Sequence, residues 1–234
     1  MDRRVFLRAC AGCAAVTAAA AQAAAGELKP RMFSRSRLID ERGQALRSAS
    51  LAAGRNYIFH YPFAGTPCFL IDLGSPTVQH VSLRTEHGSS YRWPGGVGPR
   101  RAIVAYSAIC THRMTYPTRQ ISFISYRERS SAPAVSRLNT IHCCSEHSEY
   151  DPASGARVVS GPAPQPLAAV MLEYDPASDG LHAVGTLGVD LYNAFFAKYE
   201  MKLELEHAGR ARQRVGDTAV VSELSSFCKQ QVRC

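Results

Sequence analysis

Short apolar runs fill the middle of the chain, and they indicate β-strands. Between residues 57 and 190 these runs are rich in Val, Ile, Leu, Phe and Tyr, and Gly, Pro, Ser and Asp separate them. A series of short strands at close spacing is typical of an all-β antiparallel sandwich or barrel. The predicted strands are 68–73, 77–83, 102–109, 121–126, 157–160 and 168–174.

Proline- and glycine-rich segments predict the turns between these strands. The run 94–99 reads Pro-Gly-Gly-Val-Gly-Pro, and 161–164 reads Gly-Pro-Ala-Pro. An Asp-Pro-Ala-Ser stretch occurs twice, at 151–154 and at 175–178. The second copy, followed by Asp-Gly, predicts a hairpin whose outgoing strand begins at Leu181.

The two flanks of this domain have different patterns. Residues 26–56 are polar and Arg-rich with weak periodicity, so we expect a linker that leads into a domain at 57–190. Residues 195–206 alternate between apolar and charged side chains, which predicts a strand within a C-terminal extension at 191–234. After it, we expect a polar loop at 207–219 and a short helix at 220–227, followed by a tail.

The first 25 residues have the pattern of an export signal. Arg3-Arg4 is followed by Phe6-Leu7 and an Ala-rich run, as in twin-arginine signals, and small residues near 21–26 suit cleavage. This predicts a periplasmic protein. The alternative to cleavage is that this segment is retained as a membrane anchor, which is the one route to membrane association that we expect. Ala is weakly apolar for a membrane span, which favours cleavage. A plain Ala-rich helical tail is the third interpretation.

Composition narrows the class of protein without naming a reaction. The 234 residues are 46% hydrophobic and 20% charged, as in ordinary globular proteins, and the formal net charge is +8. This charge suits docking to an acidic protein. The basic residues are scattered and do not interleave with aromatic ones, so we expect no nucleic-acid partner. We find no Ser/His/Asp arrangement, phosphate loop or paired carboxylates, so no catalytic residues are assigned.

Two short Cys/His boxes carry the candidate chemistry. The first is Cys110-Thr111-His112 and the second is Cys144-Ser145-Glu146-His147. A Rieske [2Fe–2S] centre needs two cysteines on one iron and two histidines on the other, and each box supplies one of each. The predicted cofactor and metal ligands are therefore Cys110, His112, Cys144 and His147.

Several alternatives remain open at this point. Cys143 is a second candidate for the cysteine of the second box, and His142 is then a neighbour. A Cys₂His₂ set also binds zinc in an exported binding module, and two unrelated Cys/His pairs in a β domain are the bland interpretation. The Ser-Gly-Pro-Ala-Pro run at 160–164, expected as a third loop over the cluster, favours the Rieske centre. Cys228 and Cys234 either pair or remain free thiols.

The wider stretch resembles the Rieske small subunit of arsenite oxidase, and the related iodate reductase small subunit. The resemblance covers about 55–195 and rests on 93–99, on Ile-Val-Ala-Tyr-Ser at 103–107, on both boxes, and on 172–175 with 183–185. It implies stacked antiparallel sheets with a small cluster-binding subdomain at about 105–165. Ser148 and Tyr150 are expected to donate hydrogen bonds to sulfur.

This resemblance also implies a role and partners. The chain would relay electrons from a large molybdenum-pterin subunit, which oxidises arsenite or a similar oxyanion, to a periplasmic cytochrome c or cupredoxin. The alternative is the Rieske subunit of a quinol–cytochrome c reductase of the bc type, with an uncleaved anchor.

Three features depart from the family pattern. Thr115 and Glu146 stand where most relatives carry a disulfide that ties the two loops. The segment between the boxes is long, with an Arg/Ser/Pro-rich stretch at about 126–137, and the tail beyond 200 is extended.

Overall fold

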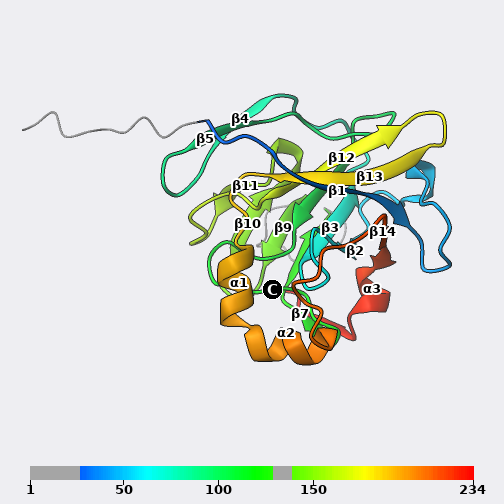
Figure 1. The fold of residues 1–234 in the computed structure, drawn as a ribbon. Coiled ribbons are helices and arrows are strands. Elements are labelled where there is room, and N and C mark those ends of the chain that lie inside the picture. Colours follow the sequence, from blue (N-terminus) through cyan, green and yellow to red (C-terminus); the bar gives the residue numbers. More distant parts are fainter. Residues whose placement is uncertain (1–26, 129–138) are drawn as a thin grey trace, which may run out of the picture.

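The computed structural model describes residues 27–128 and 139–234, and this part of the chain is all-β with three short α-helices, as expected (Figure 1). The strands are β1 (Arg31–Ile39), β2 (Tyr57–His60), β3 (Pro67–Asp72), β4 (Val81–Arg84), β5 (Ser90–Trp93), β6 (Ile103–Ser107), β7 (Ile121–Ser122), β8 (Ile124–Arg127), β9 (Thr140–Cys143), β10 (Ser148–Asp151), β11 (Arg157–Ser160), β12 (Ala169–Asp175), β13 (Gly180–Leu187), β14 (Thr218–Val220), β15 (Ser222–Glu223) and β16 (Gln230–Gln231). The helices are α1 (Tyr192–Lys198), α2 (Glu200–His207) and α3 (Leu224–Phe227), and η1 (Ser48–Ser50) and η3 (Pro152–Ser154) are 3₁₀ turns.

The main sheet has eight strands and curls round on itself. Its order is β14-β1-β13-β12-β6-β3-β2-β15, and its only parallel pairing is β1 with β14. The two edge strands, β14 and β15, are separated along the chain by Val221 alone. The edges of the sheet therefore come together, and the curled sheet encloses one apolar cluster that includes Leu38, Phe59 and Leu70.

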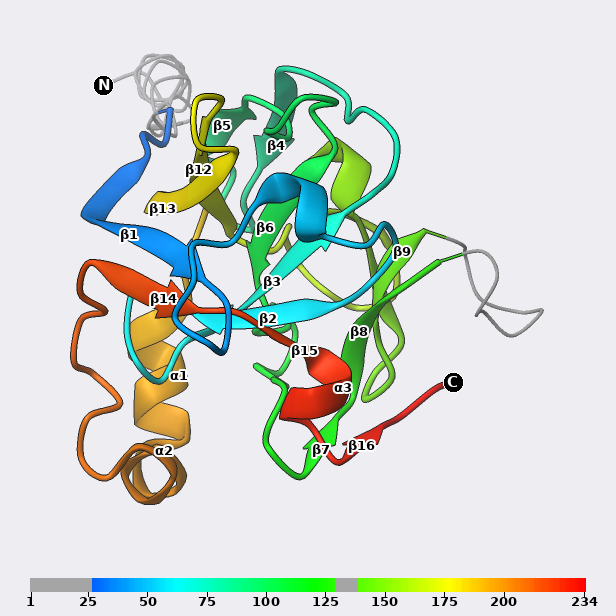
Figure 2. The same cartoon turned by 90° about the vertical axis from the view of Figure 1, so that its right-hand side faces the viewer.

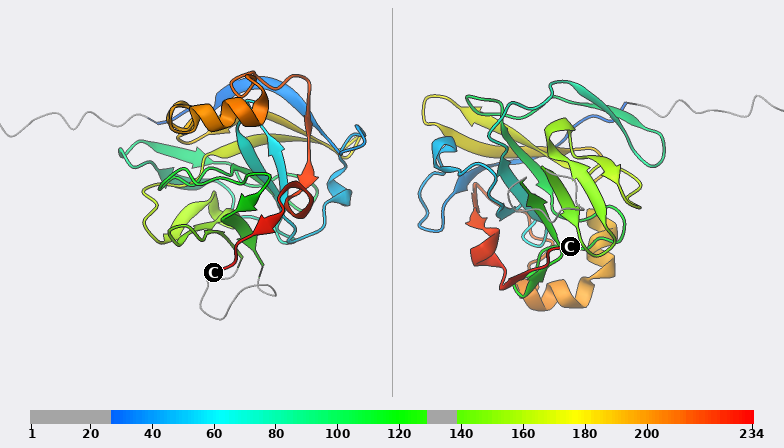
Figure 3. Two further views of the ribbon diagram at one scale, coloured as in Figure 1. Left: turned by 90° about the horizontal axis from the view of Figure 1, so that it is seen from below. Right: turned by 180° about the vertical axis from the view of Figure 1, so that it is seen from behind.

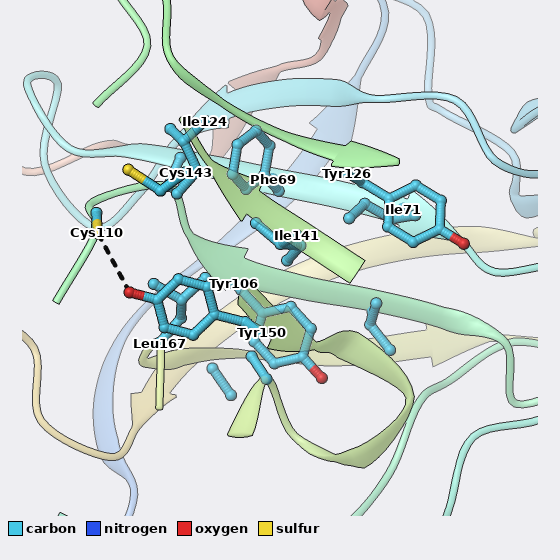
Figure 4. Close-up of a cluster of buried hydrophobic side chains, with 14 of the residues drawn as sticks. Phe69, Ile71, Tyr106, Cys110, Ile124, Tyr126, Ile141, Cys143, Tyr150 and Leu167 are labelled. Atoms are coloured by element: carbon cyan, nitrogen blue, oxygen red, sulfur yellow. Dashed lines mark hydrogen bonds between the residues drawn. The ribbon is translucent and has the colours of Figure 1, made fainter. Parts of the chain in front are cut away.

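A smaller sheet packs against the outside of the curled sheet. Its order is β11-β10-β9-β8, and every pairing in it is antiparallel. The core between the two sheets joins Phe69 and Tyr106 of the main sheet to Ile141 and Tyr150 of the smaller one (Figure 4). Because strand β3 has a packed face on both sides, all six of its residues are buried.

The hairpin predicted at 175–180 is confirmed, whereas the linker predicted at 26–56 is wrong. Strands β12 and β13 pair antiparallel up to Asp175 opposite Gly180. Strand β1 lies within the expected linker and pairs with both β13 and β14. Most of its side chains are exposed, and Ser36 and Leu38 are the buried ones, which explains why its sequence looks polar.

The strand predicted at 195–206 is also wrong, because the consecutive helices α1 and α2 occupy this segment on the outside of the sheets, with α2 turned steeply away from the axis of α1 (Figure 1 and Figure 3). Phe195, Phe196, Tyr199 and Leu203 follow a helical spacing and pack on Ile109 and Tyr116. The short helix expected at 220–227 is present only as α3.

Two sequence predictions fall outside the described residues. The export signal at 1–25 and most of the Arg/Ser/Pro-rich stretch at 126–137 belong to the ranges 1–26 and 129–138. Within the described ranges, none of the helices is long and apolar enough to cross a membrane.

Candidate metal centre

The first box begins where β6 ends. Cys110 is buried, and a tight turn follows it, with Cys110 N–H donating to Thr115 O (2.9 Å) and Met114 N–H donating to Cys110 O (2.8 Å). This turn directs the backbone N–H groups of His112 and Arg113 to the Cys110 sulfur. The sulfur thus accepts from the residues two and three positions further along, an arrangement that stabilises a thiolate.

The second box has the same local geometry, but it is built around Cys143. Cys143 is buried at the end of β9, and the backbone N–H groups of Ser145 and Glu146 donate to its sulfur. Again the donors are two and three residues further along. His147 closes the turn with a φ of +56°, a left-handed conformation that reverses the chain into β10.

The two thiols meet beneath these turns (Figure 4). The hydrogen bond between them lowers the pKa of Cys110, with further help from the Tyr150 hydroxyl, and the same bond together with burial raises the pKa of Cys143. Four backbone N–H groups therefore point at one pair of sulfur atoms. Such a pair is suited to binding one metal atom as thiolates.

Cys144, the cysteine predicted as the ligand of the second box, lies elsewhere. Its sulfur forms a disulfide with Cys234, with the two Cα atoms 5.7 Å apart. A disulfide sulfur cannot also act as a thiolate ligand, so in this structure the free thiol of the second box is that of Cys143, the second candidate from the sequence. The Cys228–Cys234 pairing is wrong, because Cys228 is a buried free thiol.

Two buried polar atoms of the turns, in His112 and Ser148, are of the kind that a bound cluster needs. His112 Nδ1 and Ser148 Oγ are buried and have no hydrogen-bond partner among the described residues. Buried polar atoms without partners are rare in folded proteins because each one costs free energy. The imidazole nitrogen of His112 could hold an iron, and the Ser148 hydroxyl could donate to a sulfur of a bound cluster, so both residues fit a Rieske centre.

The two histidines of the boxes differ in exposure. The His112 ring is partly buried, whereas His147 is exposed. The ring centroid of His147 lies 5.8 Å from that of His142. Away from the boxes, the rings of His60 and His207 are also in contact, with centroids 5.7 Å apart.

A site for one tetrahedral ion needs all its donor atoms close to one another. In the described part of the chain, one group of three His, Cys, Asp or Glu side chains has its possible ligand atoms all within 4.8 Å of one another. It consists of His142, Cys144 and Cys234. Cys110, His112 and His147 do not form such a group with either Cys143 or Cys144. The arrangement therefore disfavours a single zinc ion held by the two boxes.

Tyr150 connects the first box to the smaller sheet. Its hydroxyl lies 3.2 Å from Cys110 Sγ, accepts from Thr111 N–H (3.1 Å), and lies 3.1 Å from Thr111 Oγ1. The Thr111 hydroxyl in turn donates to Gln165 O at 2.7 Å, next to the proline-rich third loop. The sequence prediction that Tyr150 contacts a ligand sulfur agrees with this geometry.

An ion pair links the two boxes at the surface. Arg113 Nε lies 3.4 Å from Glu146 Oε1, and Lys198 of α1 donates to Arg113 O at 2.7 Å. Both side chains of the ion pair are substantially exposed, so it contributes at most about 1 kcal/mol. The link is much weaker than a covalent one.

The third loop packs closely on the second box at Gly161. This residue has a φ of +83°, and a methyl group there would overlap the carbonyl oxygen of His147 and lie 2.6 Å from the Cα of Ser148. Only glycine allows this approach of the two loops.

Replacing Gly161 by alanine is expected to displace the turn that carries His147. The left-handed backbone alone costs about 1–2 kcal/mol, and the overlap adds to it. Gly88→Ala is the matched control, because Gly88 has the same φ of +83° with open space around it. In urea unfolding, the free energy of unfolding should fall more for Gly161→Ala than for Gly88→Ala. Equal losses would mean that the third loop does not constrain the box.

The chain matches no family model. The soluble domain of the Rieske protein II (soxF) from Sulfolobus acidocaldarius is similar, with 28% sequence identity over 66% of this chain and 78% of that chain, and a TM-score of 0.45.

Proposed function

We propose that this protein is a Rieske-type electron-transfer protein with one [2Fe–2S] cluster. Cys110 and Cys143 hold one iron, and His112 and His147 hold the other. The observation that carries the proposal is the pair of buried, hydrogen-bonded thiols of Cys110 and Cys143 (Figure 4), each at the start of a turn that also carries a histidine and supplies two backbone N–H donors. Two equivalent loops, each giving one thiolate and one imidazole, match the ligand set of a Rieske centre.

When bound, such a cluster takes up and releases one electron at a time, at potentials of about −150 to +300 mV. The protein's own residues set the conditions for this. The backbone N–H groups of both turns and the Tyr150 hydroxyl direct positive dipoles at the sulfurs, which favours added negative charge. His147, the exposed ligand, offers the route by which an electron leaves the site.

Replacing Tyr150 by phenylalanine should lower the midpoint potential while the cluster remains. A hydrogen bond worth about 1 kcal/mol more to the reduced state corresponds to a shift of roughly 40–60 mV for one electron. Tyr106→Phe is the control, because its hydroxyl is equally buried but donates to Pro152 O, away from the sulfurs. Redox titration of both variants checks this. A lower potential in both would trace the shift to general loss of packing.

The wider role that we propose rests on the family resemblance and on the sequence. The chain serves as the small subunit of a periplasmic oxidoreductase related to arsenite oxidase. It accepts electrons from a molybdenum-pterin subunit and passes them to a cytochrome c or cupredoxin. The twin-arginine start supports export, and the net charge of +8 supports docking to an acidic partner.

The test of the cluster is chemical analysis and low-temperature EPR on the purified full-length protein. The proposal predicts coloured protein with two irons and two acid-labile sulfides per chain, and a paramagnetic signal that appears on reduction. Colourless, folded protein that contains zinc or no metal would contradict it. Co-purification from the native host tests the partner separately: a molybdenum subunit supports the wider role, and a cytochrome b contradicts it.

A further inference from the structure

Residues 228–234 form a strap across the segment that follows the first box (Figure 2). Strand β16 pairs in parallel with β7, Gln230 opposite Ile121 and Gln231 opposite Ser122. Backbone hydrogen bonds continue this pairing on both sides, with Lys229 N–H donating to Arg119 O (3.0 Å) and Val232 N–H donating to Ser122 O (2.8 Å). The strap is therefore fixed to the chain along the stretch 119–122.

The far end of the strap is bonded to the second box. Cys234 forms its disulfide with Cys144, the residue directly after Cys143. The strap thereby connects the segment downstream of Cys110 to the turn that carries the other candidate ligands. It joins the two halves of the site, and the other four cysteines in the described part of the chain are free thiols.

The disulfide end of the strap sits on a buried arginine. Arg127, 3% exposed, donates from Nη1 to Cys234 O (2.6 Å) and from Nη2 to Cys144 Sγ (2.6 Å) and Val232 O (3.2 Å). One guanidinium thus contacts both cysteines of the disulfide and the backbone between the strap and the box. The guanidinium therefore holds the end of the strap and the second box together.

We propose that the Cys144–Cys234 disulfide is a redox-controlled lock that keeps Cys143 and His147 in place around the cluster. This rests on the proposed function and adds regulation to the same site. The lock forms by thiol–disulfide exchange: the two thiols lose two protons and two electrons, and a partner disulfide compound is reduced to two thiols. Reduction by a dithiol reverses the step, frees Cys144 beside the ligand, and releases the turn 144–147.

The test compares Cys234→Ser with Cys228→Ser, which removes another strap thiol that is buried and not in a disulfide. Iron loss to a chelator is followed by visible absorbance, and alkylation with mass spectrometry maps the free thiols. We expect iron loss from Cys234→Ser to be about 10-fold faster, as for loss of groups that support metal ligands. Cys228→Ser should lose iron at the wild-type rate. Wild-type protein treated with a dithiol should behave like Cys234→Ser, which keeps the test valid if that variant folds poorly.

Three results would overturn the lock. They are equal iron loss in Cys234→Ser, Cys228→Ser and wild type; alkylation of Cys144 and Cys234 in unreduced wild-type protein; and stoichiometric zinc uptake by His142, Cys144 and Cys234. A wild-type protein without any cluster would instead contradict the proposed function, so the two failures are distinguishable.

Discussion

We expect Cys143→Ser to abolish the cluster. Cys144→Ser, the neighbouring substitution, should leave two irons and two sulfides per chain in the protein as purified. The Cys143 sulfur contacts Cys110 and accepts two backbone hydrogen bonds, so its loss removes one of two thiolates on the same iron. The Cys144 sulfur is bonded to Cys234 and is therefore not available as a ligand.

The comparison is well matched because the two residues are adjacent and the substitutions are the same. Iron and sulfide content, with the absorbance and EPR of the reduced protein, are measured without chelator, so that the lock does not affect the result. Cluster loss in Cys144→Ser with retention in Cys143→Ser would return the ligand role to Cys144. Retention in both would exclude the second box from the site.

Phe195→Ala is expected to lower the free energy of unfolding by about 3–5 kcal/mol, the usual cost of deleting a buried aromatic side chain. Phe195 is fully buried, and its ring lies 4.8 Å from that of Tyr116 in an edge-to-face contact. Tyr116 and Ile109 flank the first box from either side along the chain. Helices α1 and α2 therefore support the loop of Cys110, and the cavity left by the substitution should also speed iron loss.

The control for this prediction is Met201→Ala in α2, because Met201 is 80% exposed. Its effect should stay within about 0.5 kcal/mol. Urea unfolding monitored by circular dichroism gives both values. A loss below about 1 kcal/mol for Phe195→Ala would mean that α1 and α2 are not an integral part of the domain.

The sequence predicts the apolar core strands well, because their signal is local. Strands β3, β6, β11 and β12 and the turn at 175–180 all follow from short apolar runs between turn residues. Strand β1 is not predicted from local sequence, because it is held by pairing with two strands distant along the chain, β13 and β14. The segment 195–206 fits a period of two as well as a helical one, and packing on Tyr116 decides between them.

The sequence identifies both boxes, but strand register decides which of the two neighbouring cysteines, Cys143 or Cys144, lies in the core. Motif spacing points to Cys144, but β9 pairs Cys143 with Ser148 on one side and with Ile124 on the other. This register places the Cys143 side chain in the core between the sheets and Cys144 in the turn. The partner of Cys144 is 90 residues away, a separation that no local pattern reveals.

The most direct test of the cluster assignment is pulsed EPR of the reduced protein grown with ¹⁵N-labelled histidine. Two histidine ligands predict hyperfine coupling from two imidazole nitrogens on the reduced iron, one lost in His112→Ser and the other in His147→Ser if partial assembly persists. A reduced signal without strong histidine nitrogen coupling would show a cluster held by other residues and contradict the account.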